Sequence, residues 1–405
     1  MKRTIIALCL LALMASNLHS QKADSNSPVA FDSGYIIVDG GKLFYETAGK
    51  GENIVLLHDG MVDREIWDEQ FPVLAKNYRV ARYDRRNYGK SSDPQAKYSD
   101  IEDLYQLFLQ VKIDKAIIFG MSSGGGLAID FTLKYPEKVS ALVLAGAVVS
   151  GYGYTSNMFT RGGHIKSLSE VSDPQKSIKY WVWEDPYEIY SENIKAKEKV
   201  EKLLKANLHE EKGGFNKPPD RQAARFLSEI KVPVLVLVGE YDIPDVHAHG
   251  GVIEFGIPGA KREIILKSGH LIPLEQPEVF NETVLRFLRN MEFYKILDSQ
   301  GVDAAVQYFN VSHQFEPGVI VFREQEMNLL GYRYLGDGKT KDAIKLFKIN
   351  TIAFPASWNV YDSLGEAYLK DGQKDLAIKN YEKSLELDPN NENARKVLKE
   401  LKVSK

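Results

Sequence analysis

The chain has 405 residues, of which 44% are hydrophobic and 11% aromatic. This composition is typical of globular proteins and excludes a disordered or collagen-like chain, while the length allows two or three domains with their own cores. The formal net charge is −3, so the charge does not favour nucleic acid or an anionic membrane as a partner.

The N-terminal segment has the order of a secretory signal. A lysine and an arginine precede an apolar run at 5–15, which is shorter than the roughly 20 residues that a membrane-spanning helix needs. We therefore expect a signal peptide over residues 1–20 and an exported, periplasmic or extracellular protein with no membrane span in the mature chain. An uncleaved anchor is the alternative. The single cysteine, Cys9, falls in this segment, so the mature chain would have no disulfide and no cysteine nucleophile.

From residue 34 onward, short apolar runs alternate with amphipathic stretches. Two segments of alternating pattern flank Gly40 and Gly41 and predict a β-hairpin. The next strands are expected at 53–58, 78–84, 115–120 and 140–149, with helices among them at 100–111 and 127–136. Strands that alternate with helices predict a mainly parallel sheet with helices on both faces.

The alternation stops over about residues 150–230, which are helical in pattern and rich in aromatic residues: Tyr152, Tyr154, Phe159, Trp181, Trp183, Tyr187 and Tyr190. Strands then resume at 232–239 and 262–267, before a helix at 277–291. An insertion of this length is too long for one crossover. We therefore expect a helical cap over the carboxyl edge of the sheet, where α/β sheets bind ligands. An ordinary run of crossover helices is the alternative.

After residue 291 the strand pattern disappears and a repeat begins. Residues 328–355 align without gaps on 362–389, and the matched positions, all 34 apart, are Leu330/Leu364, Gly331/Gly365, Tyr334/Tyr368, Gly338/Gly372, Ala343/Ala377, Phe347/Tyr381 and Pro355/Pro389. The period and the order of small and aromatic residues resemble tetratricopeptide repeats. Two such units should not be stable alone, so we expect helices at 302–309 and 393–401 to cover their ends. We expect the repeats to dock on the catalytic domain, to mediate self-association or to bind a protein partner.

The stretch GMSSG, residues 120–124, follows an apolar strand and precedes a glycine-rich helix. A Walker phosphate loop would need a lysine that is missing here. A dinucleotide loop would need a carboxylate at the end of the next strand, which has none. The stretch fits G-x-S-x-G, in which a nucleophilic serine on a strained turn has small residues two places before and after it. Ser122 has glycine at both places, whereas Ser123 has Met121 two places before it. We therefore predict Ser122 as the nucleophile, with a coincidental glycine turn as the alternative.

Two further residues follow in the order serine, acid, histidine that this motif requires. Asp242 comes just after an apolar strand, and His270 lies in the loop after the last strand. His270 would take the proton from Ser122, and Asp242 would fix the imidazole tautomer and stabilise its positive charge. Asp245 is the rival acid. We expect the rate to rise with pH through one ionisation near the unperturbed histidine value of about 6.5.

His247 and His249 lie close to these acids and raise the question of a metal site. Their spacing puts them on opposite sides of a strand and awkwardly apart on a helix. The sequence therefore predicts neither a metal nor another cofactor.

A tetrahedral oxyanion needs two backbone donors. The amide of Ser123 is one, at the start of a helix whose dipole also helps. The second is expected from the loop after the strand at 53–58, most simply from Gly60 or Met61. His58, in the same loop, is interpreted as a structural histidine that braces it.

These residues carry a resemblance to the α/β-hydrolase superfamily over roughly residues 34–290. It rests on four blocks in order: LLHDG with Trp67 nearby, YDRRNYGKS, GMSSGGGLAIDF with KYPEKVSALVLAG, and SGHLIPLEQPE. Capped members that include enol-lactonases, proline iminopeptidase-like peptidases and carbon–carbon bond hydrolases are the most similar. The resemblance implies an α/β-hydrolase domain at 28–292 with its cap at about 150–230, followed by a helical repeat domain at 293–405.

The chain departs from the family pattern at two positions. Asp59 stands where the family has glycine, and because a carboxylate would oppose the developing oxyanion, we expect its side chain to point away. Asn87 replaces another glycine, and asparagine tolerates the positive φ that such a turn requires.

The expected activity is that of an exported serine hydrolase acting on an ester, lactone or amide carbonyl of a small, partly apolar substrate. One alternative keeps the triad but changes the chemistry to carbon–carbon hydrolysis, perhydrolysis or a lyase reaction. The other is a catalytically inert binding protein that acts through its helical repeats.

Overall fold

The computed structural model describes residues 30–156, 158, 174–190, 192–207, 215–316 and 318–403. The expected signal peptide and Phe159 lie outside the described residues. The chain divides into two compact units between Phe280 and Asn281, inside helix α10 (Pro277–Gln300). The domain boundary expected at residues 292 and 293 falls within the same helix and stays a prediction.

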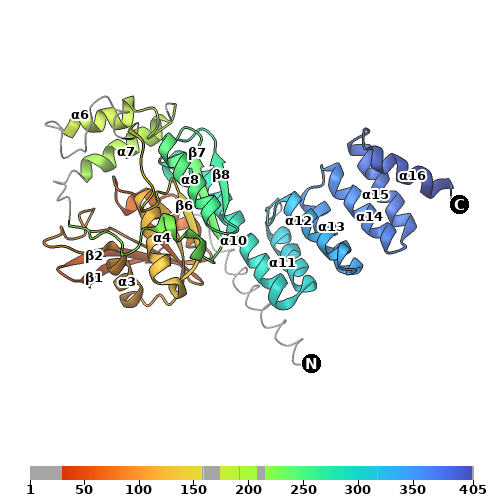
Figure 1. Ribbon diagram of the computed structural model, residues 1–405, viewed down its shortest axis with the longest axis horizontal. Coiled ribbons are helices and arrows are strands. Elements are labelled where there is room, and N and C mark those ends of the chain that lie inside the picture. The colour runs from red at the N-terminus through yellow and green to blue at the C-terminus, as the bar shows by residue number, and fades with distance from the viewer. Residues whose placement is uncertain are drawn as a thin grey trace. The chain divides into compact units, whose positions relative to one another are not determined.

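An eight-stranded sheet forms the centre of the first unit (Figure 1). The strands are β1 (Phe31–Val38), β2 (Gly41–Ala48), β3 (Asn53–Leu57), β4 (Arg79–Tyr83), β5 (Ala116–Met121), β6 (Val139–Ala145), β7 (Val234–Gly239) and β8 (Lys261–Ile265). Their order is β1-β2-β4-β3-β5-β6-β7-β8. The first two pairings are antiparallel and all the others are parallel. The expected mainly parallel sheet is confirmed.

The strand order places the site. The chain goes from β3 outward to β4 and then crosses to β5 on the other side of β3. Such a reversal leaves a crevice at the carboxyl ends of the two neighbouring strands, because their loops diverge in opposite directions. The loop after β3 and the start of α4 (Ser123–Lys134) lie at this crevice.

Apolar side chains cover the sheet and pack under α3 (Asp100–Gln110), α4 and α8 (Pro244–Gly256). The neighbouring strands β5, β6 and β7 are nearly unbroken aliphatic runs because they are buried on both faces. The β1–β2 hairpin turns at Gly40, whose φ of 70° is the conformation that favours glycine.

The insertion between β6 and β7 contains α6 (Pro174–Lys179), a π-helical turn at Tyr180–Glu184 and α7 (Ile194–Ala206), and α6 and α7 lie together in Figure 1. Its two ends are tied to each other and to α4. The Ser150 hydroxyl donates to Asp130 Oδ1 at 2.7 Å and accepts from the Ala223 amide at 2.8 Å. This insertion occupies the segment where the sequence predicts the cap, and the name is kept for it below.

The second unit is entirely helical over its described residues. The two repeat units are the helix pairs α12 (Glu324–Gly336) with α13 (Thr340–Ala353) and α14 (Trp358–Lys370) with α15 (Lys374–Leu387). As expected, helices cover their ends: α11 (Val302–Phe315) packs on α13, and α16 (Glu392–Val403) packs on α15. Figure 1 shows the succession of these helices.

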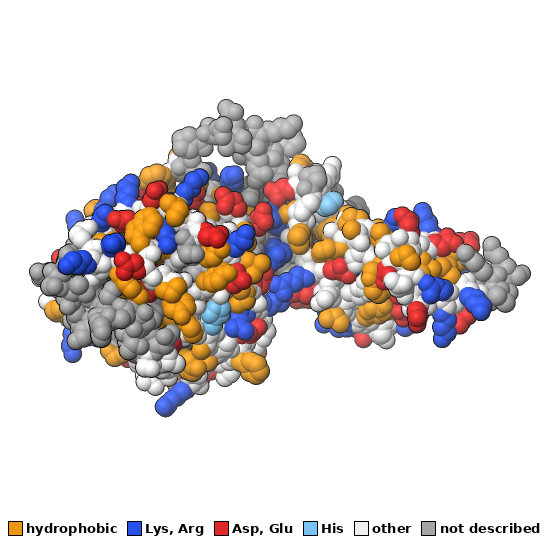
Figure 2. Space-filling model, turned by 90° about the horizontal axis from the view of Figure 1, so that it is seen from above, with side chains coloured by type: hydrophobic (Ala, Val, Ile, Leu, Met, Phe, Trp, Pro, Cys, Tyr) orange, Lys and Arg blue, Asp and Glu red, His pale blue; other side chains and the backbone are white. Residues whose placement is uncertain are grey.

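Figure 2 shows acidic and basic side chains interspersed over the visible face of the described residues. This surface agrees with the small net charge of the chain. In the described ranges, every helix is too short or too polar to cross a membrane.

The repeat offers a matched pair of glycines for a stability test. A Cβ at Gly331 would lie 2.5 Å from the Phe347 ring, whereas one at Gly365 would lie 3.2 Å from the Tyr381 ring. Gly331→Ala should cost about 1–3 kcal/mol of stability by overpacking. Gly365→Ala should be close to neutral, because alanine's helix propensity, better by about 1 kcal/mol, offsets a milder contact. Thermal unfolding of the full chain, followed by circular dichroism, measures both; equal losses would contradict this packing argument.

Candidate active site

The turn between β5 and α4 holds Ser122 in a strained conformation, with φ 52° and ψ −115°. Two close approaches produce it. A Cβ at Gly120 would lie 2.5 Å from the Gly124 carbonyl oxygen, and a Cβ at Gly124 would lie 2.3 Å from the His58 carbonyl oxygen. Only glycine fits at either place, which is the physical reason for the spacing seen in the sequence.

Three of the predicted site residues form one hydrogen-bonded chain. The Ser122 hydroxyl lies 2.9 Å from His270 Nε2, and His270 Nδ1 lies 2.9 Å from Asp242 Oδ1. Because a carboxylate can only accept, Nδ1 carries the proton and Nε2 is left to accept from the serine. The Ile243 amide donates to the same Asp242 oxygen at 2.7 Å. This is the arrangement that a nucleophile, its base and an orienting acid require.

These three side chains follow β5, β7 and β8, so the parallel sheet brings them to one edge. The imidazole is closely enclosed, because a Cβ at Gly146 would lie 3.0 Å from the His270 ring. The side chain of Asp242 is fully buried and that of His270 is 6% exposed. Burial keeps water from competing for the hydrogen bonds between them.

The rival acid is engaged elsewhere. Both carboxylate oxygens of Asp245 accept hydrogen bonds from the amide and hydroxyl of Thr155, in the first part of the cap. His249 is buried on the same helix α8, and its Nδ1 accepts from the Val149 amide. Among the described residues, no three His, Cys, Asp or Glu side chains converge to hold a metal ion.

Asp59 decides between the two candidates for the second oxyanion donor. Its Oδ1 accepts from the amides of Met61 at 3.1 Å and Val62 at 2.9 Å, so the amide of Met61 is already occupied. The carboxylate thus caps its own loop, and the expectation that it points away from the oxyanion stays a prediction. Within the described part of the chain, the Gly60 amide has no acceptor. Gly60 and Ser123 therefore remain as the candidate donor pair.

Gly60 and Ser123 are also neighbours in space. A Cβ at Gly60 would lie 3.2 Å from Ser123 Oγ. Arg85, which the sequence analysis did not single out, binds both segments: its Nη2 donates to the Asp59 carbonyl at 2.6 Å and to Ser123 Oγ at 3.0 Å. One guanidinium thus fixes the spacing of the two loops that carry the candidate donors.

His58 braces the same loop, as expected. Its Nε2 accepts from the Arg85 amide at 2.9 Å, so Nδ1 carries the proton and donates to the Asp59 carbonyl at 2.7 Å. Burial lowers its pKa well below the usual value, which keeps the ring neutral. Asn87 has the positive φ, 71°, that the replaced glycine would have adopted.

The electrostatics of His270 correct the expected pH dependence. Burial by itself lowers the pKa of His270, but the charge and hydrogen bond of Asp242 outweigh it. With the charges of Glu188 and Asp59, they raise the pKa to about 9. Burial raises the pKa of Asp59 itself, although it accepts two amide hydrogen bonds. The histidine is thus surrounded by acids that favour its protonated form.

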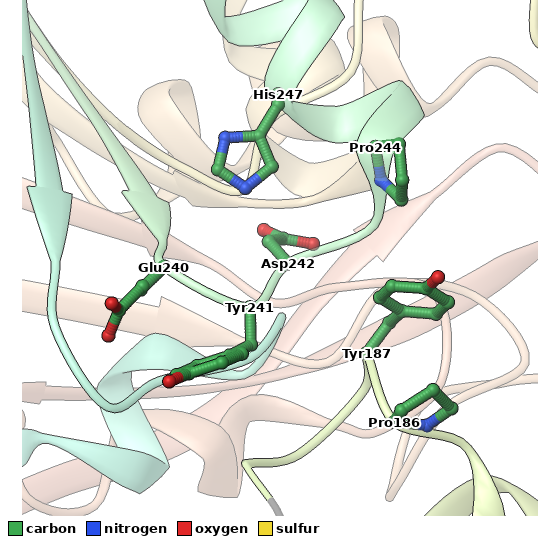
Figure 3. A pocket seen from close by; sticks show the side chains of 7 residues that line it. All are labelled: Pro186, Tyr187, Glu240, Tyr241, Asp242, Pro244 and His247. Atoms are coloured by element: carbon green, nitrogen blue, oxygen red, sulfur yellow. The ribbon is translucent and has the colours of Figure 1, made fainter.

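Two pockets lie beside these residues. One, of about 280 Å³, is lined by Ser123 and Arg85 together with Leu127, Val149 and Tyr152. The other, of about 490 Å³, lies behind the acid (Figure 3), where Asp242 sits among His247, Tyr187 and Tyr241. The first has a mixed polar and apolar lining that includes Ser123, one of the candidate oxyanion donors.

Comparison with known families agrees with this architecture. The model of the alpha/beta hydrolase fold family matches residues 53–277, which is more than half of the chain, and a tetratricopeptide repeat model matches residues 363–391. The chain belongs to the alpha/beta hydrolase fold family, and it is a hydrolase enzyme with a C-terminal helical region that contains a tetratricopeptide repeat.

Individual relatives differ in their reactions. The chain is 26% identical to the 2-hydroxy-6-oxo-6-(2'-aminophenyl)hexa-2,4-dienoic acid hydrolase of Metapseudomonas resinovorans, covering 66% of this chain and 95% of the relative. It is 24% identical to carboxylesterase YbfK of Bacillus subtilis, covering 64% and 89%. The crystal structure of a hydrolase from Pseudomonas aeruginosa matches with a TM-score of 0.53 and 25% identity, covering 64% and 98%.

Substituting the two acids separately tests their assignment. Asp242→Asn should lower kcat by about 10⁴-fold, because an amide next to Nδ1 favours the wrong imidazole tautomer. Asp245→Asn should leave kcat within about threefold of the wild type, since its partner is Thr155 in the cap. Steady-state hydrolysis of a short-chain aryl ester compares the two variants. The opposite ranking would make Asp245 the acid.

The pH profile tests the charges around His270. The base must be neutral, so a raised pKa means low activity in acid and a rise that continues above the unperturbed value of about 6.5. In Asp59→Asn the midpoint of kcat/KM should move downward, because one negative charge that stabilises the imidazolium is removed. Rates of the aryl ester from pH 5 to 10 measure both midpoints. A flat wild-type profile would count against His270 as the base.

Proposed function

We propose that the first unit is an exported serine hydrolase that cleaves the ester, lactone or amide carbonyl of a small, partly apolar substrate through an acyl-enzyme. The observation that carries this proposal is the hydrogen-bonded chain from Ser122 through His270 to Asp242, next to two amides that have no acceptor among the described residues. Export rests on the N-terminal segment of the sequence alone.

Each group has a chemical role in this mechanism. Ser122 Oγ attacks the carbonyl carbon while His270 Nε2 takes its proton, and Asp242 stabilises the imidazolium that forms. The amides of Ser123 and Gly60 donate to the oxyanion, and the start of α4 adds its dipole. His270 then gives the proton to the leaving group, and a water molecule, activated by the same histidine, releases the acyl group from Ser122.

The pocket beside Ser123 supports the proposed substrate class. Its volume of about 280 Å³ suits a small molecule, and Leu127, Val148 and Val149 supply aliphatic surface. Tyr152 and Tyr154 come from the start of the cap and complete the wall. A lining that combines polar and aliphatic groups favours an ester or amide with an alkyl or aryl portion.

Carbon–carbon bond hydrolysis is the second candidate. It is favoured by the similarity to the hexadienoic acid hydrolase of Metapseudomonas resinovorans, at 26% identity, and it would use the same three side chains. Turnover of a vinylogous diketone without turnover of simple esters would select it.

For the second unit, the tetratricopeptide repeat at 363–391 supports a role in binding a protein partner or a second copy of the chain.

Labelling with a fluorophosphonate probe tests the nucleophile directly. The wild type should be labelled, and Ser122→Ala should lose labelling completely because the attacking oxygen is gone. Ser123→Ala keeps its backbone amide and should still be labelled, at a rate lowered by about tenfold or less, since it loses only the contact with Arg85.

Gel fluorescence of the full chain, with folding checked by circular dichroism, gives the result. A folded wild type that the probe does not label would refute the serine hydrolase proposal and favour an inert binding protein. Labelling that survives in Ser122→Ala but not in Ser123→Ala would transfer the role to the second serine.

A further inference from the structure

A segment of the cap rests directly on the loop that carries His270. We call residues 185–190 the strap; they run between the π-helical turn and α7. The His270 amide donates to the carbonyls of Tyr187 at 2.9 Å and Glu188 at 3.0 Å, and the Leu271 amide donates to Glu188 at 3.3 Å. The two backbones are so close that a Cβ at Gly269 would lie 2.5 Å from the Tyr187 carbonyl oxygen. The histidine therefore sits on a backbone that the cap supports.

Glu275, at the end of α9 (Ile272–Glu275), joins the same two segments through its side chain. Both of its carboxylate oxygens lie 3.0 Å from the Gly269 amide, and Oε2 accepts from the Tyr190 amide at 2.6 Å. Its backbone carbonyl accepts from Asn193 Nδ2 at 2.7 Å. One residue thus bonds to the residue before His270, to the strap and to the residue that caps α7.

The cost of burying this carboxylate argues against a purely packing role. Glu275 is 4% exposed, and among the described residues no Lys, Arg or His lies within ion-pair distance of it, although the charge of the buried Lys197 interacts with it from farther away. Burial and the negative charge of Asp242 raise the pKa of Glu275 to about 7. The amides of Gly269 and Tyr190, which donate to the carboxylate, lower the pKa but do not offset the rise. An apolar residue would avoid this desolvation but would leave the amides of Gly269 and Tyr190 without an acceptor.

We propose that Glu275 is a positioning residue that holds the strap and the His270 loop together as one unit, so that the placement of the cap sets the orientation of the imidazole toward Ser122. This inference rests on the proposed serine hydrolase function. Its consequence concerns specificity. A substrate that binds the cap in the productive position aligns His270 through the strap, so that part of its binding energy appears in kcat and not only in KM.

The second pocket gives the strap a further connection to the site. Pro186 and Tyr187 of the strap form one wall, and Tyr241 and Asp242 form another (Figure 3). Tyr241 stacks on Tyr190 of the strap, with ring centroids 4.9 Å apart. A displaced strap would therefore disturb the contacts around the acid as well as those of the histidine.

Glu275→Gln in the full chain tests the proposal. In either orientation of the amide its nitrogen faces a backbone N–H, because both carboxylate oxygens accept from Gly269 and Oε2 also accepts from Tyr190, and two donors cannot bond. We expect kcat for a short-chain aryl ester and the fluorophosphonate labelling rate to fall by about tenfold to a hundredfold, with KM within about threefold. The downfield proton resonance of His270 Nδ1–H should weaken or shift, because the imidazole no longer keeps one orientation toward Asp242.

Glu46→Gln is the matched control. Glu46 is also 4% exposed, but its partners are Arg82 at 2.8 Å and Arg64 at 3.2 Å, away from the strap. This variant should lower the melting temperature while the labelling rate of the folded protein and the His270 resonance stay as in the wild type. A Glu275→Gln variant that behaves like this control, losing only stability, would overturn the proposal.

Asn193→Asp keeps the test decisive if Glu275→Gln does not fold. Aspartate still caps α7 by accepting from the Ala196 amide, but it cannot donate to the Glu275 carbonyl. We expect kcat to fall and the His270 resonance to weaken or shift as in Glu275→Gln, but by less. If kcat and the His270 resonance of this variant also equal those of the wild type, the coupling between the strap and His270 is refuted. A wild type that the probe does not label would instead refute the proposed function, and the His270 resonance would still report on the strap.

Discussion

The first unit depends on one close approach, between the first turn of α4 and the ends of β3 and β5. At Gly120 and Gly124 the backbones touch so closely that no side chain fits, and this contact holds Ser122 at a φ of 52°. Strain of this kind persists only where the surroundings fix it. The conformation points Oγ at His270 Nε2 and leaves the Ser123 amide at the start of a helix. The strand order then determines which loops can reach this point.

Charge at the site serves two opposed requirements. Asp242, Glu188 and Asp59 all favour the imidazolium form of His270, which helps when the base accepts the serine proton. The same charges keep the free histidine protonated to higher pH and oppose an oxyanion nearby. Among the described residues, Arg85 is the one buried cation bonded to the loop after β3 that holds Asp59 and Gly60, and it also bonds to Ser123. Its position offsets part of the acidic field where negative charge develops.

The sequence predicted the parts of the site that follow from local pattern and chain order. The eight strands have distinct apolar runs, and Ser122, Asp242 and His270 each follow one of them, so a parallel sheet must bring them to one edge. The choice between Gly60 and Met61 could not be predicted, because it depends on which amides the Asp59 side chain accepts from. Asp59 stands where the family has glycine, and the neighbouring sequence does not indicate which amides its side chain binds.

The residues that sequence reasoning missed act between distant segments. Arg85 bonds to Ser123, 38 positions away, and Glu275 bonds to Tyr190, 85 positions away. Both residues lie inside sequence blocks that carry the family resemblance. The sequence therefore indicated that these segments matter, but not which residues Arg85 and Glu275 bind. Long-range polar contacts of this kind depend on how the loops pack, and composition and periodicity report only on neighbours along the chain.

The topology explains why the cap and the histidine meet. The cap is inserted between β6 and β7, and the sheet continues from β6 to β7 and β8 at its edge. A chain that leaves the carboxyl end of β6 and must return to the start of β7 passes over the ends of the last two strands, where Asp242 and His270 lie. The strap runs along this path, and its carbonyls accept from the His270 loop. An insertion at this point of the fold is therefore placed to contact His270 and Asp242, whereas one at the β1–β2 hairpin, on the opposite edge of the sheet, would not reach either.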